Sequence, residues 1–323
     1  MSIIFLFILL ILESPYSERY VACWYLLGYI VLTRLPMLLC LLFLGKGLGR
    51  FDLRVWGSRE DLKGDLFLVY LFVLGAMFIT KIPLIPFHVW LPIVHAEASR
   101  PVSVCLRGYI MKLGILGVCR FCYQVLSVRV FNNYYVWACF LAAIMFFLAA
   151  SRELDGKRWL AFLSLSHIVV ACAILGVGKA FMGGVSFLYC LGHGLSAGLI
   201  FLFLWFIYDI SSTRKLLLLK GGVGSRLLLR CVACAGLCTA CSLPPTVQFF
   251  SEVILVSCRG GFRVVFMILL YLFLFGGGLV PLFIIGNLIR RHCDVSSRGD
   301  VKVVGVFSLV ILLCWSFLLF LVC

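Results

Sequence analysis

Long apolar runs separated by short polar segments dominate this chain. A membrane-spanning helix needs about 20 predominantly apolar residues. Nine runs approach or exceed that length: 21–44, 66–92, 102–121, 134–150, 159–177, 180–208, 231–258, 262–289 and 303–322. The pattern therefore predicts an all-α, polytopic transmembrane helical bundle, formed as a single integral membrane domain over residues 1–323.

A shorter apolar run occupies residues 3–12. Ten helical residues cover about 15 Å, which is half of the ~30 Å hydrocarbon core of a bilayer. We expect this segment to be half of a helix, or a helix that lies in the membrane interface.

Prolines interrupt two of the long runs. Pro83 and Pro86 lie within 66–92, and the sequence "SLPPTVQFFSE" lies within 231–258. Proline lacks an N–H donor and its ring clashes with the carbonyl four residues earlier, so the helix kinks or breaks. Broken helices occur at membrane depth where the backbone is buried in protein or lines a wet cavity. We therefore predict proline-broken helices at the midplane.

Composition agrees with a membrane location. The chain is 64% hydrophobic, with a mean hydropathy of +1.16, whereas soluble domains are about 45–50% apolar. The net charge of +15 does not indicate a nucleic-acid partner, because the basic residues gather in short segments such as 44–63 and 212–226. Lysine and arginine are expected at the membrane ends of helices. Their distribution over alternate loops does not decide the orientation.

The 16 cysteines are scattered through the apolar runs. Four of them, at positions 231, 234, 238 and 241, follow the spacing of one helix face. Zinc and iron–sulfur sites more usually draw their ligands from loops or short knuckles. We interpret the four as a packing stripe of small side chains.

The beginning of the sequence, "MSIIFLFILLILE", has no basic region and no small-residue cleavage site. It also lacks the arginine and serine content of a transit peptide. These features are consistent with an organelle-encoded or bacterial membrane protein.

Five ionisable residues lie deep in the predicted helices: Lys81, Lys112, His167, His193 and Glu252. Such a side chain at the bilayer centre costs about 2.5–3.5 kcal/mol on insertion scales. Taken singly, a histidine can serve packing, a lysine can extend to the head groups and a glutamate can pair with a neighbour. Together they indicate a proton relay, because the proton affinity of a buried group responds to neighbouring charges. Nothing in the sequence indicates a phosphate loop, a catalytic nucleophile, or a haem, flavin or metal site.

A family resemblance begins at Lys81. The stretch "KIPLIPFHVWLPIVHAEASRPVSV" and the following "YIMKLG" resemble the signature of NADH dehydrogenase subunit 4, an antiporter-like membrane subunit of respiratory complex I. "LSLSHIVV", "LGHGLSAGLIF" and "SLPPTVQFFSE" resemble later segments of that family. The resemblance runs from about residue 17 to the end of the chain. Signature positions are matched by Lys81, Pro83, His88, Trp90, Leu91, Pro92, His95, Glu97, Ala98, Lys112 and Gly114.

The resemblance implies a proton-translocating subunit of mitochondrial NADH:ubiquinone oxidoreductase, located in the mitochondrial inner membrane. Lys81 would drive a proton half-channel, Lys112 and His167 would form the central relay, His193 would belong to the same polar axis, and Glu252 would be its terminal group. FMN, iron–sulfur clusters and ubiquinone are expected elsewhere in the complex, and no cofactor is expected in this chain. Expected partners are the antiporter-like subunits 2 and 5 and bound lipid such as cardiolipin. A subunit of a cation/proton antiporter, and a non-pumping structural remnant, remain alternatives.

The sequence departs from the family pattern in three ways. About four further helices are expected at the N-terminus. The family's membrane glutamate, which pairs with the lysine at the position of Lys81, would fall before residue 1, so either Glu13 serves or a separately encoded fragment supplies it. We favour the fragment. Arg34 and Arg107 stand where the family is usually uncharged or small, and Arg107 could act on the proton affinity of Lys112 or reach the head groups.

Overall fold

The computed structural model describes residues 17–47, 49, 65–97, 100–122, 131, 133–177, 181–211, 213–216, 223, 227–259, 264–289 and 303–322. These residues form helices joined by turns, with no strand among them. The elements are α2 (Ser17–Gly47), α3 (Asp65–Lys81), α4 (Trp90–Glu97), α5 (Arg100–Cys105), the π-helix η3 (Leu106–Ile110), α6 (Met111–Gly117), the π-helix η4 (Val118–Cys122), α8 (Asn133–Arg152), α9 (Gly156–Leu175), α10 (Met182–Ser211), α12 (Leu227–Ala240), α13 (Val247–Arg259), α14 (Val264–Ile289) and α15 (Val303–Val322).

Six helices of the described part are long and apolar enough to cross a membrane. They are Cys23–Gly47, Val102–Phe121, Asn133–Arg152, Gly156–Leu175, Met182–Ser211 and Val264–Ile289. Shorter apolar helices cover Leu68–Lys81, Leu227–Ala240, Val247–Cys258 and Gly305–Leu318. The prediction of an all-α transmembrane bundle is confirmed; residues 3–12 lie outside the described residues.

The two runs with closely spaced prolines are broken helices, as predicted, whereas α2 and α14 continue through the single Pro36 and Pro281. The run 66–92 divides into α3, which ends at Lys81, and α4, which begins at Trp90. The run 231–258 divides into α12 and α13. The 14 residues of α12 and the 13 residues of α13 each cover only about 20 Å, so neither crosses the ~30 Å core alone.

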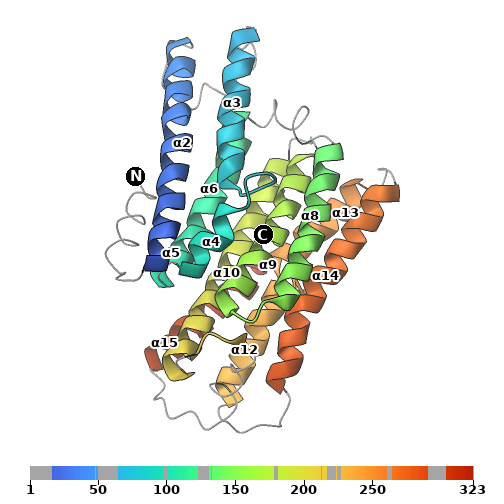
Figure 1. The fold of residues 1–323 in the computed structure, drawn as a ribbon. Coiled ribbons are helices and arrows are strands. Elements are labelled where there is room, and N and C mark those ends of the chain that lie inside the picture. The colour runs from blue at the N-terminus through green and yellow to red at the C-terminus, as the bar shows by residue number, and fades with distance from the viewer. Residues whose placement is uncertain are drawn as a thin grey trace.

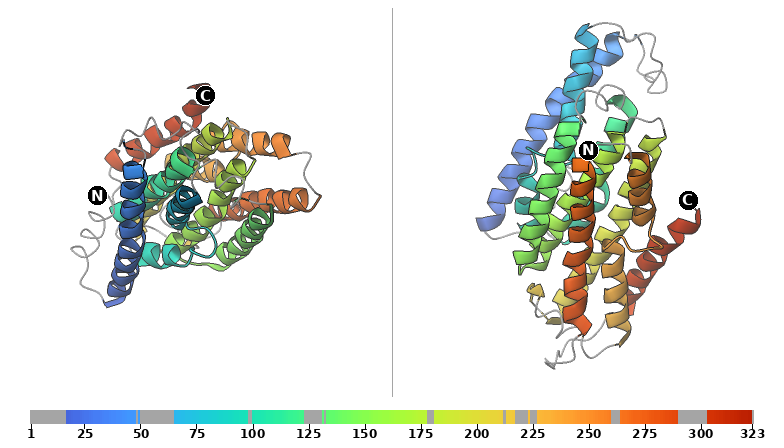
Figure 2. Two further views of the ribbon diagram at one scale, coloured as in Figure 1. Left: turned by 90° about the horizontal axis from the view of Figure 1, so that it is seen from above. Right: turned by 90° about the vertical axis from the view of Figure 1, so that its right-hand side faces the viewer.

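The helices run roughly parallel, with α9 and α10 near the middle of the bundle (Figure 1). Almost every residue of α9 is buried, because α8, α10, α4, α13 and α14 all pack against it. The pair α2 and α3 projects beyond the rest at one end, and α15 lies obliquely across α10 and α12 at the other (Figure 2). This arrangement brings polar side chains of α9, α10 and α13 into the most enclosed part of the molecule.

Candidate functional site

Lys81 ends α3 and faces α2. Its Nζ atom donates to the sulfur of Met37 at 3.2 Å and lies 5.2 Å from the centroid of the Phe78 ring. Arg34 of α2 is near enough to act on Lys81 electrostatically. A thioether is a weak acceptor, and Lys81 forms no ion pair within the described part of the chain. The carboxylate that the resemblance implies for Lys81 is therefore not supplied by these residues; Glu13 lies outside the described residues.

Lys112 lies in the middle of the span formed by η3, α6 and η4. Its Nζ atom donates to the backbone carbonyl of Arg107, five residues earlier. Gly194 of α10 leaves room for the lysine stem: a Cβ atom there would lie 3.4 Å from Lys112 Cε and 3.2 Å from the carbonyl oxygen of Gly108. Lys112 is therefore buried against α10, near enough to His193 to act on it electrostatically.

Arg107 is fully buried, with no exposed surface. Its Nη1 atom donates to the carbonyl of Leu160 and to Oγ of Ser164, both on α9. Its guanidinium carbon lies 5.1 Å from the centroid of the Phe201 ring, a cation–π distance. The alternative in which Arg107 reaches the head groups is therefore wrong. The side chain crosses the interior instead, and its charge acts on Lys112.

His167 of α9 and His193 of α10 face each other, with ring centroids 5.7 Å apart and ring planes 32° apart. Both rings are buried, and the Nε2 atom of each lacks a hydrogen-bond partner in the described structure. A cavity with about 10 Å³ of space for a water centre is lined by both histidines and by Ser164 and Ser196. About 10–15 Å³ of such space holds one water molecule. The two rings therefore have room for a bridging water.

Gln248 of α13 is a further partner of His193. With its amide oxygen turned toward the ring, Gln248 accepts from Nδ1 of His193 at 3.2 Å, and its amide nitrogen donates to the carbonyl of Thr239 at 2.8 Å. This orientation satisfies both ends of the amide. It ties α10, α12 and α13 together at the level of the histidines.

Tyr189 links His167 to Glu252. The tyrosine is fully buried on α10, and its hydroxyl oxygen lies 3.4 Å from Nδ1 of His167. The Glu252 carboxyl group has the hydroxyls of Tyr189 and Ser242 beside it. Oε1 of Glu252 has no hydrogen-bond partner within the described part. A hydroxyl both donates and accepts, so Tyr189 can pass a proton between an imidazole and a carboxylate.

Four of the five predicted residues thus meet in one polar line. It runs from Lys112 through His193, His167 and Tyr189 to Glu252, and we call these five residues the polar axis. Lys81 is not in direct contact with the axis. Lys81 instead packs against α6, the helix that carries Lys112, because a Cβ atom at Gly114 of α6 would lie 3.1 Å from the Cβ atom of Lys81.

Tyr189, Gln248 and the burial of His95 were not predicted from the sequence. Tyr189 precedes His193 by four residues and Gln248 precedes Glu252 by four, so each shares a helix face with a predicted residue. That spacing is the signal by which both could have been found. His95 is fully buried, and its ring stacks on Phe201 at 5.9 Å between centroids. Both nitrogens of His95 lack partners in the described structure.

The cysteine stripe on α12 packs only in part. Cys241 is buried and Cys234 and Cys238 pack against the core, but Cys231 is exposed. Among the described residues no group of three His, Cys, Asp or Glu side chains is placed to hold a metal ion.

Comparison with known proteins gives a match to one family model. Residues 1–280 match the profile of the family described as NADH:quinone oxidoreductase/Mrp antiporter, TM. The chain belongs to this family. The match includes every residue of the polar axis and Lys81.

Curated relatives point to one branch of the family. "NADH-ubiquinone oxidoreductase chain 4" of Chondrus crispus is 35% identical over 191 residues, which are 58% of this chain and 38% of that protein. The chain 4 protein of Mytilus edulis is 30% identical over 235 residues, which are 70% and 52% of the two chains. The present chain thus spans about half the length of the curated relatives it matches, or less.

Solved structures share the fold. A chain of Thermus thermophilus respiratory complex I with bound NADH gives a TM-score of 0.80 at 19% identity, covering 98% of this chain and 69% of that one. A chain of the Mrp complex of Dietzia gives 0.77 at 14% identity, covering 94% and 66%. These likenesses confirm an antiporter-like membrane subunit fold.

Proposed function

We propose that this chain is a proton-translocating membrane-arm subunit of mitochondrial NADH:ubiquinone oxidoreductase, located in the inner membrane. The polar axis carries the proposal: lysine, two histidines, tyrosine and glutamate form an enclosed line with unpaired nitrogen and oxygen atoms and room for water. The resemblance to chain 4 proteins supports the choice of complex.

In this proposal the chain's own residues bind and move protons. Lys112 exchanges a proton with the histidines, the pair His167 and His193 carries it through a bridging water, and Tyr189 passes it to Glu252. A change of charge at one group alters the proton affinity of the next, because Coulomb interactions are strong in a low-dielectric interior. FMN, iron–sulfur clusters and ubiquinone bind other subunits and supply the redox energy.

We further propose that Lys81 receives a carboxylate from outside the described residues, from Glu13 or from a separately encoded chain. The weak thioether contact of Lys81 supports this assignment. The antiporter-like subunits 2 and 5 are the proposed neighbours in the membrane arm. A density map of the native complex tests the assignment by showing what lies within hydrogen-bond distance of Lys81. Surroundings made only of lipid and apolar side chains would contradict it.

The decisive experiment is Lys112→Ala in the assembled complex, with Lys46→Ala as the matched control. Lys112 is buried in the axis, whereas Lys46 lies exposed in the last turn of α2. Because acid–base groups contribute about 10²–10⁴-fold to proton transfer, proton transport through this subunit falls by about 100-fold or more in Lys112→Ala. The measurement is the number of protons pumped per NADH oxidised by vesicles, and Lys46→Ala leaves it unchanged.

Unchanged pumping in an assembled Lys112→Ala complex would establish the alternative of a structural subunit that fills its place without pumping. The second alternative is a cation/proton antiporter subunit, with which the similarity in fold to a chain of the Mrp complex is compatible. It predicts sodium- or potassium-driven proton flux in vesicles without NADH, and co-purification without flavin or iron–sulfur proteins.

A further inference from the structure

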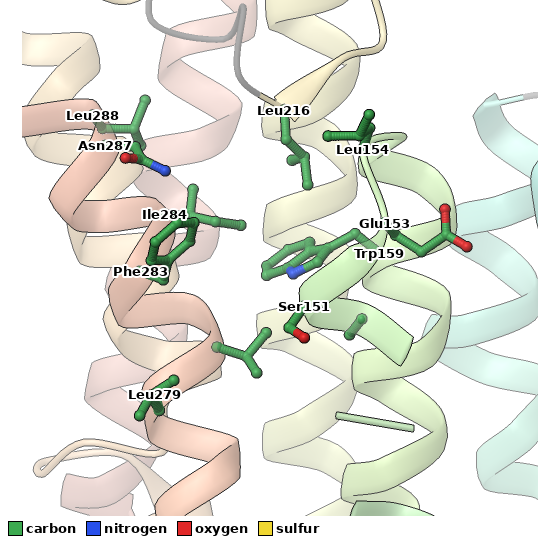
Figure 3. A pocket seen from close by; sticks show the side chains of 12 residues that line it. Ser151, Glu153, Leu154, Trp159, Leu216, Leu279, Phe283, Ile284, Asn287 and Leu288 are labelled. Atoms are coloured by element: carbon green, nitrogen blue, oxygen red, sulfur yellow. The ribbon is translucent and has the colours of Figure 1, made fainter. Parts of the chain in front are cut away.

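A cavity of about 260 Å³ lies outside the polar axis, between the end of α8, the beginning of α9 and the second half of α14 (Figure 3). Its volume is many times the roughly 10–15 Å³ that one water molecule needs. Most of its wall is apolar, and the lining residues include Ala150, Leu154, Trp159, Leu279, Phe283 and Ile284.

The cavity extends from the ends of the helices into the apolar part of the bundle. Its α14 wall runs from Leu279 to Leu288, or about 13 Å along the helix axis. Asn287 lies in the last turn of α14, at the same end as the last residues of α8. Leu279 and Phe283 are 48% and 65% exposed, so the cavity opens along the outer surface of a candidate membrane span.

A short backbone pairing closes the end of the cavity. The amide of Leu216 donates to the carbonyl of Leu154 at 2.8 Å, and the amide of Gly156 donates to the carbonyl of Arg214 at 3.0 Å. This pairing holds the side chains of Leu154 and Leu216 over the space between Trp159 and α14 (Figure 3). The wall is therefore built by residues far apart in the sequence.

The two segments that meet at this closed end are rich in basic residues. In the described segments 151–158 and 213–216, five residues are basic and two, Glu153 and Asp155, are acidic. The basic residues are Arg152, Lys157, Arg158, Arg214 and Lys215. Three of them are chain neighbours of residues that line the cavity. The Glu153 carboxylate points away from the space between Trp159 and α14 (Figure 3).

We propose that the cavity binds one acyl chain of an anionic phospholipid, whose phosphate lies among the basic residues at the end of α8 and the beginning of α9. An elongated apolar space that opens toward the bilayer suits a hydrocarbon chain, and basic clusters at helix ends attract anionic head groups. A zwitterionic lipid would gain the same apolar contacts without the charge complementarity. The site is independent of proton transport.

The test uses the purified complex and a phosphatidylglycerol that carries a photoactivatable group in its acyl chain, with the matching phosphatidylcholine in parallel. Mass spectrometry locates the labelled peptides. We expect the peptide containing residues 279–288 to be labelled several-fold more by phosphatidylglycerol. Each basic residue near a membrane surface contributes about 1 kcal/mol, so we expect the double variant Arg152→Gln, Arg158→Gln to abolish this several-fold preference at low salt.

Leu279→Trp fills the cavity, and Leu282→Trp is its matched control. Both leucines are 48% exposed on α14, but only Leu279 lines the cavity. We expect Leu279→Trp to abolish labelling and Leu282→Trp to preserve it, with both complexes assembled on native gels. Arg120→Gln, an exposed arginine at the opposite end of the bundle, preserves the lipid preference.

Three results would overturn the proposal. Equal labelling in Leu279→Trp and Leu282→Trp would place the lipid elsewhere. Equal labelling by the two lipids in the unchanged complex would show that the charge of the head group does not contribute to binding. No labelling above that of a lipid without the photoactivatable group would leave a neighbouring subunit as the occupant.

Discussion

At the scale of single residues, the interior contains ionisable side chains whose buried nitrogen or oxygen atoms lack hydrogen-bond partners in the described structure. Arg107 uses Nη1 for two bonds to α9, while its Nε and Nη2 atoms are unpaired in the described structure. Buried polar groups without partners are costly, and they commonly mark functional sites or positions of internal water. Their concentration around Lys112 and the two histidines is what separates this region from an ordinary helix interface.

Tyr189→Phe tests the link between His167 and Glu252. The substitution removes only the hydroxyl that lies 3.4 Å from His167 Nδ1 and leaves the ring packing in place. We expect proton pumping per NADH to fall, while the complex assembles and its melting temperature drops by the equivalent of about 1 kcal/mol. Tyr134→Phe is the control, because Tyr134 is 65% exposed. Equal pumping in the two variants would exclude Tyr189 from the proposed proton path.

At the scale of elements, close packing of helices places the charged groups. The broken helix α3 lies against α6 at two glycines: a Cβ atom at Gly114 would lie 2.8 Å from Ile82 Cγ1, and one at Gly117 would lie 2.3 Å from the Phe78 ring. The π-helical turns η3 and η4 flank α6 on both sides. Lys112 therefore sits on a short helical segment whose rotation is set by its neighbours.

Gly114→Ala tests this packing, with Gly108→Ala as its control in the same span. The added methyl of Gly114→Ala meets Ile82, the Lys81 stem and the carbonyl of Phe78, whereas a Cβ atom at Gly108 has nothing within 4 Å. Overpacking typically costs about 1–3 kcal/mol. We expect Gly114→Ala to lower the thermal stability of the complex and its pumping, and Gly108→Ala to change neither. Similar behaviour of the two variants would contradict the close approach of α3 and α6.

At the scale of the whole molecule, large apolar surfaces remain exposed on the described residues. The candidate span Cys23–Gly47 has only 22% of its most apolar window buried, and that of Val264–Ile289 has 39%. Soluble proteins rarely expose contiguous apolar surface of this extent. A lipid bilayer and the proposed neighbouring subunits would stabilise such faces.

Extraction behaviour follows from these surfaces. We expect the chain to stay in the membrane pellet after alkaline carbonate and high salt, and to enter solution only with detergent, because its apolar helices are held by the hydrocarbon core. A peripheral subunit of the same complex is the control and is released by carbonate. Recovery of this chain in the carbonate supernatant would contradict a spanning arrangement.

Much of the fold could be predicted because the insertion of a segment into a membrane depends mainly on that segment's own residues. An apolar run of about 20 residues is stabilised in a bilayer whatever its neighbours are. Prolines weaken a helix locally through their own missing N–H, and the closely spaced pairs Pro83/Pro86 and Pro244/Pro245 break it. The breaks after Lys81 and before Glu252 were therefore visible in the sequence, as was the presence of lysine, histidine and glutamate at membrane depth.

Only the tertiary structure decided which of these groups meet. His167 and His193 come together because α9 and α10 pack side by side, and Tyr189 reaches Glu252 because α13 lies against α10. The burial of Arg107 depends on acceptors that α9 presents more than 50 residues later. Such contacts join distant parts of the chain, so no local pattern encodes them. The sequence determined a membrane bundle with buried ionisable groups, and packing turned those groups into a connected line.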